Sequence, residues 1–156
     1  MRFSRFAILL AVAAIAVAQQ HPNFSGTWNI NVAESDFSDK RTSPPDSLVF
    51  TIQQKGEAFK YRVAREKDGK KGHYDVEVSV NGPAYESDAA GIITMKWKGE
   101  KLEIATLYNP GQDRQSDATE TWSLSADGKK LTSDVVQRLP RNAGEVHVTR
   151  VFDKKN

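Results

Sequence analysis

Arg150 is the residue of this sequence whose position most strongly suggests a chemical role. It shares one face of an alternating segment with Val148 and Phe152, so its guanidinium is expected to point into an apolar interior. An unpaired buried charge is costly, so this group needs a partner. The partner is either the ring of Trp28, through a cation–π contact, or a carboxylate, from Glu120 or from a ligand. A structural role and a ligand-gripping role both stay open.

Signatures of catalysis are sparse in the chain. It has no cysteine, and it contains neither a Gly-x-Ser-x-Gly elbow, a His-Glu-x-x-His motif nor a phosphate-binding glycine loop. Glu120 is the acid that we place on an inward face, so no carboxylate pair for acid–base work is predicted. His73 and His147 fall on outward positions without a third ligand nearby. We therefore expect neither an enzyme nor a cofactor.

The N-terminus has the pattern of a cleavable signal peptide. Arg2 and Arg5 precede an unbroken apolar run of 13 residues, 6–18, which ends in small side chains. This run is shorter than the roughly 20 residues that a permanent membrane helix needs. We expect cleavage after Ala18, with Ala16 as the alternative, and a secreted or periplasmic protein without a transmembrane segment.

Removal of this segment changes the charge and exposes a new N-terminus. The 22 basic and 20 acidic residues of the full chain become 20 of each once Arg2 and Arg5 are lost, which gives no basis for nucleic-acid binding. The mature chain would begin Gln19-Gln20-His21, and an amine with a histidine at position three can chelate Cu(II) or Ni(II). Because a free tail is the commoner case, we predict no metal site, with His21 as the weak exception.

Beyond the signal, apolar residues recur at every second position, as in half-buried antiparallel strands. The clearest example is 74–80, where one tyrosine and three valines alternate with polar residues. Gly56, Gly99, Asp68-Gly69 and Asp127-Gly128 supply hairpin turns between segments that are adjacent in sequence. We expect about nine strands, at 26–31, 47–54, 58–65, 73–80, 92–98, 101–108, 118–125, 130–139 and 145–153.

The predicted fold is all-β: a single antiparallel up-and-down meander barrel of about eight to ten strands, following the signal peptide at 1–18. The barrel domain would span 26–156, after a flexible mature N-terminus at 19–25. Closure hides both the apolar face and the strand edges. A barrel of this size is either filled by its own side chains or holds one small ligand.

Two short ends of the chain resemble the calycin superfamily, which includes lipocalins and fatty-acid-binding proteins. Phe24-Ser25-Gly26-Thr27-Trp28 is similar to the family's opening F-x-G-x-W, and Val148-Thr149-Arg150-Val151-Phe152 is similar to its last strand with an inward arginine. The segment 120–129 also resembles hairpins of secreted bacterial lipocalin-like proteins. The resemblance implies that Gly26, Trp28 and Arg150 close the barrel.

The resemblance implies two different roles for Arg150. In lipocalins the corresponding arginine packs on the tryptophan, whereas in fatty-acid-binding proteins an arginine and a tyrosine two residues later hold the ligand carboxylate. Phe152 occupies that second position here and has no hydroxyl, and 33–46 lacks the paired helices of a lid. Both departures weigh against the carboxylate grip.

We therefore expect an exported small-molecule-binding barrel with an apolar or amphipathic ligand. The alternative is a filled barrel that acts as a partner-binding or envelope-associated module without a ligand. The sequence does not identify a protein partner. The candidate ligand-binding residues are Arg150, Trp28, Glu120, Trp122, Tyr61, Tyr74 and Trp97.

Overall fold

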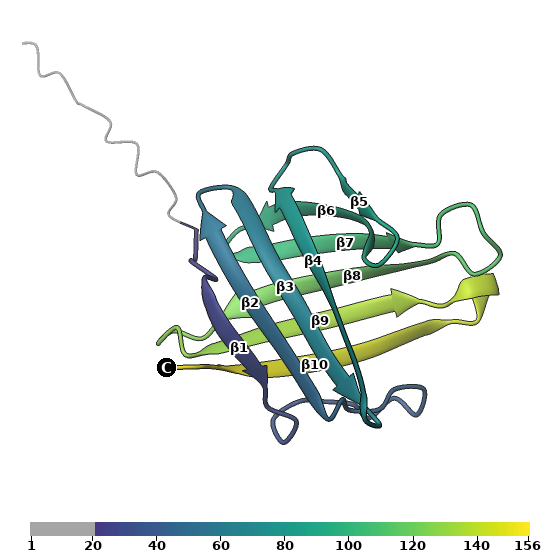
Figure 1. Ribbon diagram of the computed structural model, residues 1–156, viewed down its shortest axis with the longest axis horizontal. Helices are drawn as coiled ribbons and strands as arrows, with labels where there is room; N and C mark the ends of the chain where they lie inside the picture. Colours follow the sequence, from purple (N-terminus) through teal and green to yellow (C-terminus); the bar gives the residue numbers. More distant parts are fainter. Residues whose placement is uncertain (1–20) are drawn as a thin grey trace, which may run out of the picture.

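The computed structural model describes residues 21–156 and is built almost entirely of β-strands (Figure 1). The predicted signal peptide, with both of its cleavage positions, lies outside the described residues. No helix between residues 21 and 156 is long and apolar enough to cross a membrane. The strands are β1 (Gly26–Ile30), β2 (Ser47–Lys55), β3 (Ala58–Lys67), β4 (Lys70–Ser79), β5 (Tyr85–Ser87), β6 (Gly91–Lys98), β7 (Lys101–Tyr108), β8 (Ser116–Leu124), β9 (Lys130–Arg138) and β10 (Glu145–Lys154), and a 3₁₀ turn covers Pro140–Asn142.

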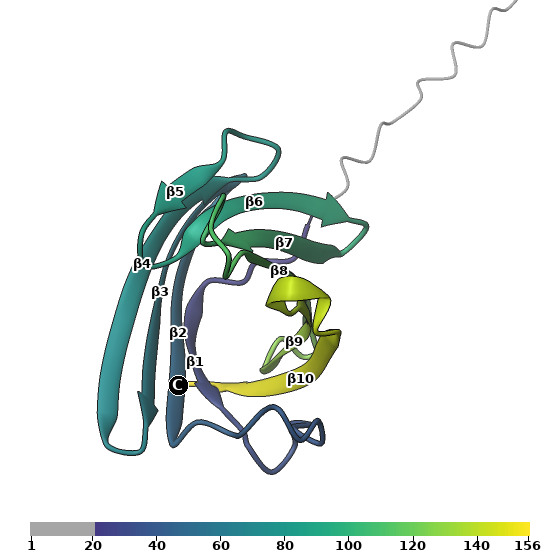
Figure 2. The same ribbon diagram turned by 90° about the vertical axis from the view of Figure 1, so that its right-hand side faces the viewer.

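The strands form one antiparallel sheet in the order β4-β3-β2-β1-β10-β9-β8-β7-β6-β5. The predicted all-β meander is thereby confirmed, with ten strands. The tenth strand, β5, lies in the expected loop 81–91 and is too short for an alternation to reveal it. The end strands β4 and β5 do not form a strand pair. An isolated bridge joins Val80, next to β4, to Met95, and Tyr85 Oη of β5 donates to the backbone carbonyl of Asp75 on β4 at 2.8 Å. The barrel is therefore nearly closed, and Figure 2 shows its two curved walls around a common interior.

The hairpin turns follow the glycine pattern with one exception. Asp68 and Gly69 both have positive φ, 50° and 73°, as a type I′ turn between β3 and β4 requires. Gly56 and Gly99 likewise have positive φ in two-residue turns. The connection between β8 and β9 is longer, because 125–129 form a five-residue loop in which Gly128 has a φ of 67°.

One end of the barrel is filled by aromatic side chains. Phe24, Trp28 and Phe152 are fully buried, and the ring of Phe50 lies 4.5 Å from that of Phe152 and 5.5 Å from that of Trp122. Residues 21–25, part of the expected flexible segment 19–25, pack against this end because Phe24 enters the core. We call this the closed end.

The closure between β1 and β10 differs in one contact from the lipocalin pattern. Trp28 pairs in register with Lys154, whose ammonium lies 5.1 Å from the centre of the indole. A Cβ on Gly26 would come within 2.8 Å of the Lys154 side chain, so glycine leaves room for that lysine. The cation over Trp28 is therefore Lys154, and the suggested stack of Arg150 on Trp28 is wrong.

On the outer face of β7, Glu103 is held between two lysines. Lys96 lies 2.9 Å from its carboxylate, and Lys98 is a second ion-pair partner. Hydrogen bonds from these two lysines, of which the one from Lys98 has the larger effect, lower the pKa of Glu103. The barrel wall thus carries a shielded acid whose charged form is favoured by folding.

Candidate functional site

The half of the barrel away from the closed end encloses a cavity of about 270 Å³. Its floor is formed by Phe50 and Trp122, which belong to the aromatic core. Isoleucines 93 and 104 line one wall, and polar side chains line the upper part. The barrel is accordingly filled at one end and hollow at the other, an arrangement between the two alternatives predicted for the interior.

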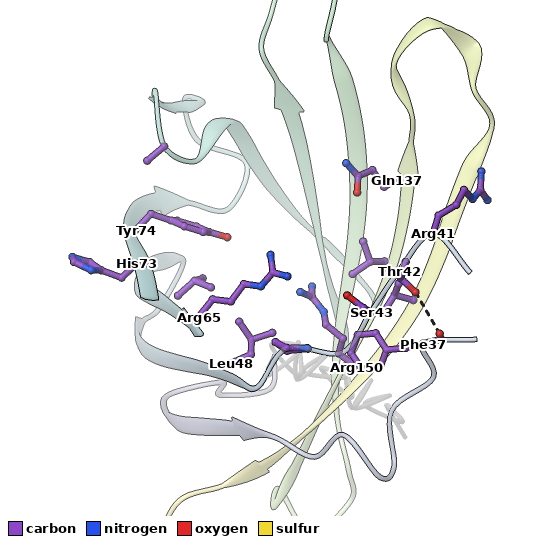
Figure 3. Close-up of a pocket in the computed structure, with 16 residues that line it drawn as sticks. Phe37, Arg41, Thr42, Ser43, Leu48, Arg65, His73, Tyr74, Gln137 and Arg150 are labelled. Atoms are coloured by element: carbon purple, nitrogen blue, oxygen red, sulfur yellow. Dashed lines mark hydrogen bonds between the residues drawn. The ribbon is translucent and has the colours of Figure 1, made fainter. Parts of the chain in front are cut away.

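The cavity joins a wider outer pocket of about 680 Å³ at the mouth of the barrel. The outer pocket also contacts Phe37, Thr42 and Ser43, from the loop that follows β1, and His73 of β4 (Figure 3). Six residues line both spaces, which makes the two continuous: Val63, Arg65, Tyr74, Val135, Gln137 and Arg150.

Arg150 forms a compact network with Glu120 and Ser133. Its Nη2 lies 2.9 Å from Glu120 Oε1, and its Nε and Nη2 donate to Ser133 Oγ at 3.2 and 3.0 Å. Ser133 Oγ donates to Glu120 Oε1 at 2.6 Å, and Trp122 Nε1 donates to the same oxygen. The guanidinium carbon also lies 5.8 Å from the centre of the Phe50 ring. Of the two partners that the sequence allowed, the carboxylate of Glu120 is the observed one.

Ser133 is a member of this network that the sequence analysis missed. It is fully buried on β9, between the inward Leu131 and Val135. A single hydroxyl in an otherwise apolar inward row is the signal that could have identified it, because buried polar groups require hydrogen-bond partners.

Arg65 is the second cation of the cavity and was also missed. It follows Tyr61 and Val63 on the same face of β3, as the alternation predicts, and its side chain is exposed to solvent where the cavity meets the outer pocket. Among residues 21–156, no carboxylate lies within ion-pair distance of its guanidinium. Figure 3 shows Arg65 and Arg150 extending toward each other from opposite walls. The charges of Arg65, Arg150 and Glu120 leave the cavity with one net positive charge.

Three tyrosines line the same cavity and stay protonated at neutral pH. Burial raises the pKa of Tyr61, Tyr74 and Tyr108, and the negative charge of Glu120 adds to the effect. Each hydroxyl can therefore donate a hydrogen bond to a guest. With the amide of Gln137, these groups make the upper cavity rich in donors.

The remaining candidates lie elsewhere. Trp28 is sealed in the closed end, and Trp97 packs at the same end, where its Nε1 donates to Glu57 at 3.0 Å. His21 stacks on Trp97 with ring centres 4.1 Å apart and planes nearly parallel. Between residues 21 and 156, no group of three potential metal-ligating side chains surrounds His21 or any other position. Trp28 and Trp97 are thus core residues, whereas the other five candidates line the cavity: Arg150, Glu120, Trp122, Tyr61 and Tyr74.

Comparison with solved structures identifies the architecture. Secretory abundant heat soluble protein 4 from Ramazzottius varieornatus superposes with a TM-score of 0.59 at 11% identity, over 89% of this chain and 100% of that one. The shared fold is a nearly closed antiparallel β-barrel. A mutant of the REP1-NXSQ fatty acid transporter gives a TM-score of 0.51 at 12% identity, over 84% of this chain and 97% of that one. No protein-family model and no curated protein sequence matches the chain.

Proposed function

We propose that this protein is an exported carrier that holds one small amphipathic molecule inside the barrel. The observation that carries the proposal is the enclosed cavity of about 270 Å³ that opens into the outer pocket. Ligand pockets usually measure about 300–1,000 Å³, so the cavity suits a compact guest that reaches into the mouth. Apolar rings at the floor and donors above match a molecule with one apolar and one polar end.

Two further observations support the proposal. The barrel resembles in fold a protein named as a fatty acid transporter, and this likeness supports a carrier role. The basic start and 13-residue apolar run of the sequence support export. A secreted or periplasmic location remains a prediction from the same features.

The alternative, a barrel without a guest that acts through its surface, draws support from the closed end. There Phe24 and Phe152 are fully buried, and the ring of Phe152 lies 4.5 Å from that of Phe50. Under this alternative the polar cavity holds only water, and blocking it would leave the activity of the protein unchanged.

Titration with the neutral fluorophore phenylnaphthylamine and a series of fatty acids tests the carrier directly. Trp122 lines the cavity, so its emission should report binding. Ala118 of β8 also lines the cavity, so the larger side chain of Ala118→Phe should block it. Ala105→Phe, on the outer face of the neighbouring strand β7, is the matched control. We expect saturable one-to-one binding that weakens at least tenfold only in Ala118→Phe. Circular dichroism would confirm that both variants fold, and silence of the wild type toward every probe would refute the carrier.

A further inference from the structure

The two arginines of the cavity face each other, although like charges repel. Arg65 comes from β3 and Arg150 from β10, and their guanidiniums approach within the space that both pockets share (Figure 3). Only one carboxylate, that of Glu120, lines the cavity. The arrangement therefore carries one positive charge more than the protein itself balances there.

The negative charge of Glu120 balances the positive charge of Arg150. Nη2 of Arg150 contacts the carboxylate at 2.9 Å, and Ser133 Oγ accepts hydrogen bonds from Nε and Nη2. The guanidinium thus donates two hydrogen bonds to Ser133 and forms an ion pair with Glu120. Since its charge is already paired, Arg150 gains less from a negative ligand than a free arginine would.

Arg65 is in the opposite situation. No hydrogen bond or ion pair occupies its guanidinium within residues 21–156. Its cross-strand neighbour on β4 is Gly72, where a Cβ would meet nothing within 4 Å, so there is open space beside the side chain. The hydroxyl of Tyr74 and the amide of Gln137 line the same shared space. A free cation, open space and protonated neighbouring donors are the elements of an anion site.

We infer that the ligand is a monoanion and that Arg65 holds its carboxylate or sulfonate group, while Arg150 positions the site through its pair with Glu120. This inference rests on the carrier function proposed above. The negative group lies where the cavity meets the outer pocket, and the apolar body extends toward Phe50 and Trp122 at the floor. A neutral molecule of the same shape binds without using Arg65.

Two fluorophores that share one aromatic skeleton separate the carrier from its charge preference. Anilinonaphthalene sulfonate carries a sulfonate, and phenylnaphthylamine is its neutral counterpart. Arg65→Gln should weaken the anionic probe at least tenfold and change the neutral probe less than twofold. Arg62→Gln is the matched control, because Arg62 lies on the same strand but faces outward and pairs with Asp75 at 2.8 Å. It should affect neither probe.

Salt and rescue provide independent checks. Affinity for the anionic probe should fall as ionic strength rises, and the slope should flatten in Arg65→Gln. Arg65→Lys keeps the charge and should recover part of the affinity. In Ala118→Phe both probes should be lost, which shows that the signal comes from the cavity.

The results distinguish the two proposals. Unchanged affinity of Arg65→Gln for the sulfonate, with the neutral probe still bound, would overturn the role of Arg65 and leave the carrier standing. Loss of the sulfonate in a folded Arg150→Gln but not in Arg65→Gln would transfer the anion to Arg150. Failure of the wild type to bind either probe would remove both proposals.

Discussion

The pair of Arg150 and Glu120 should stabilise the barrel whether or not a ligand is present. Removing one partner of a fully buried ion pair costs about 3–5 kcal/mol, because the other charge stays behind without compensation. Both side chains here are 20% exposed, so partial solvation reduces this to about 2–3 kcal/mol. For a domain of this size, about 3–5 °C of melting temperature accompany each kcal/mol, which gives a loss of about 6–15 °C in Arg150→Gln.

A double-mutant cycle measures this coupling. Glu120→Gln removes the charge but keeps a carbonyl oxygen that can accept from Trp122 and Ser133. Each single variant leaves one partner unmatched, whereas Glu120→Gln with Arg150→Gln replaces the ion pair by two neutral amides. We therefore expect the double variant to be more stable than the sum of the single changes indicates, by about 1.5–2 kcal/mol. Urea denaturation followed by tryptophan fluorescence at neutral pH, without ligand, provides the measurement.

The exposed pair of Arg62 and Asp75 is the control for the cycle. Its two side chains are both 55% exposed and span β3 and β4 at 2.8 Å. Because solvent screens such pairs, the cycle of Arg62→Gln and Asp75→Asn should show no coupling beyond error. Additive losses at Arg150 and Glu120, within about 0.5 kcal/mol, would refute the argument that this network is structural.

Three further predictions concern pH and backbone geometry. Folding lowers the pKa of Glu103 from 4.5, so the stability that its charge contributes is present above about pH 4.5 and is lost as the pH falls through the lower pKa of the folded state. In urea titrations the free energy of unfolding should therefore fall more on acidification in the wild type than in Glu103→Gln. Equal falls in the two proteins would contradict this. Burial raises the pKa of Tyr74 above 10, so the free energy of unfolding should fall as the pH rises past 10. The fall should be smaller in Tyr74→Phe, and an equal fall in both proteins would show that the hydroxyl is not buried. Gly91 and Gly99 both have positive φ, 82° and 62°, but only a Cβ on Gly91 would lie 2.5 Å from a backbone oxygen of β7. Gly99→Ala should therefore lower the free energy of unfolding by about 1–2 kcal/mol and Gly91→Ala by clearly more, as measured by thermal denaturation. Equal losses of stability would exclude the steric clash.

The alternation of residues along the strands predicts which side chains face inward. Tyr61 and Val63 of β3 are buried as the period of two requires. The same rule extends to Arg65, but a charged residue looks like the end of an apolar segment, so this cavity cation escaped prediction. Arg150 was recognised because apolar residues flank it on both sides.

The alternation does not predict how far along the barrel axis an inward side chain lies. Trp97 and Trp122 both face inward, yet Trp97 lies at the closed end and Trp122 at the cavity floor. Strand register does not separate them, because both pair with Leu102 of β7. The difference depends on the three-dimensional curvature of the barrel and on the entry of Phe24 into the core, neither of which a single strand pattern determines. The short strand β5 escaped for a related reason, because three residues show no periodicity.

The pairing of β1 with β10 has a consequence for how the chain acquires its shape. Ile30 pairs with Phe152, 122 positions later, so the two walls are joined by a contact between distant parts of the chain. Such non-local contacts form late and slowly, since loop-closure entropy opposes them. Until β10 pairs with β1, one edge of β1 stays open and the cavity lacks Arg150, so the complete binding site depends on this long-range pairing.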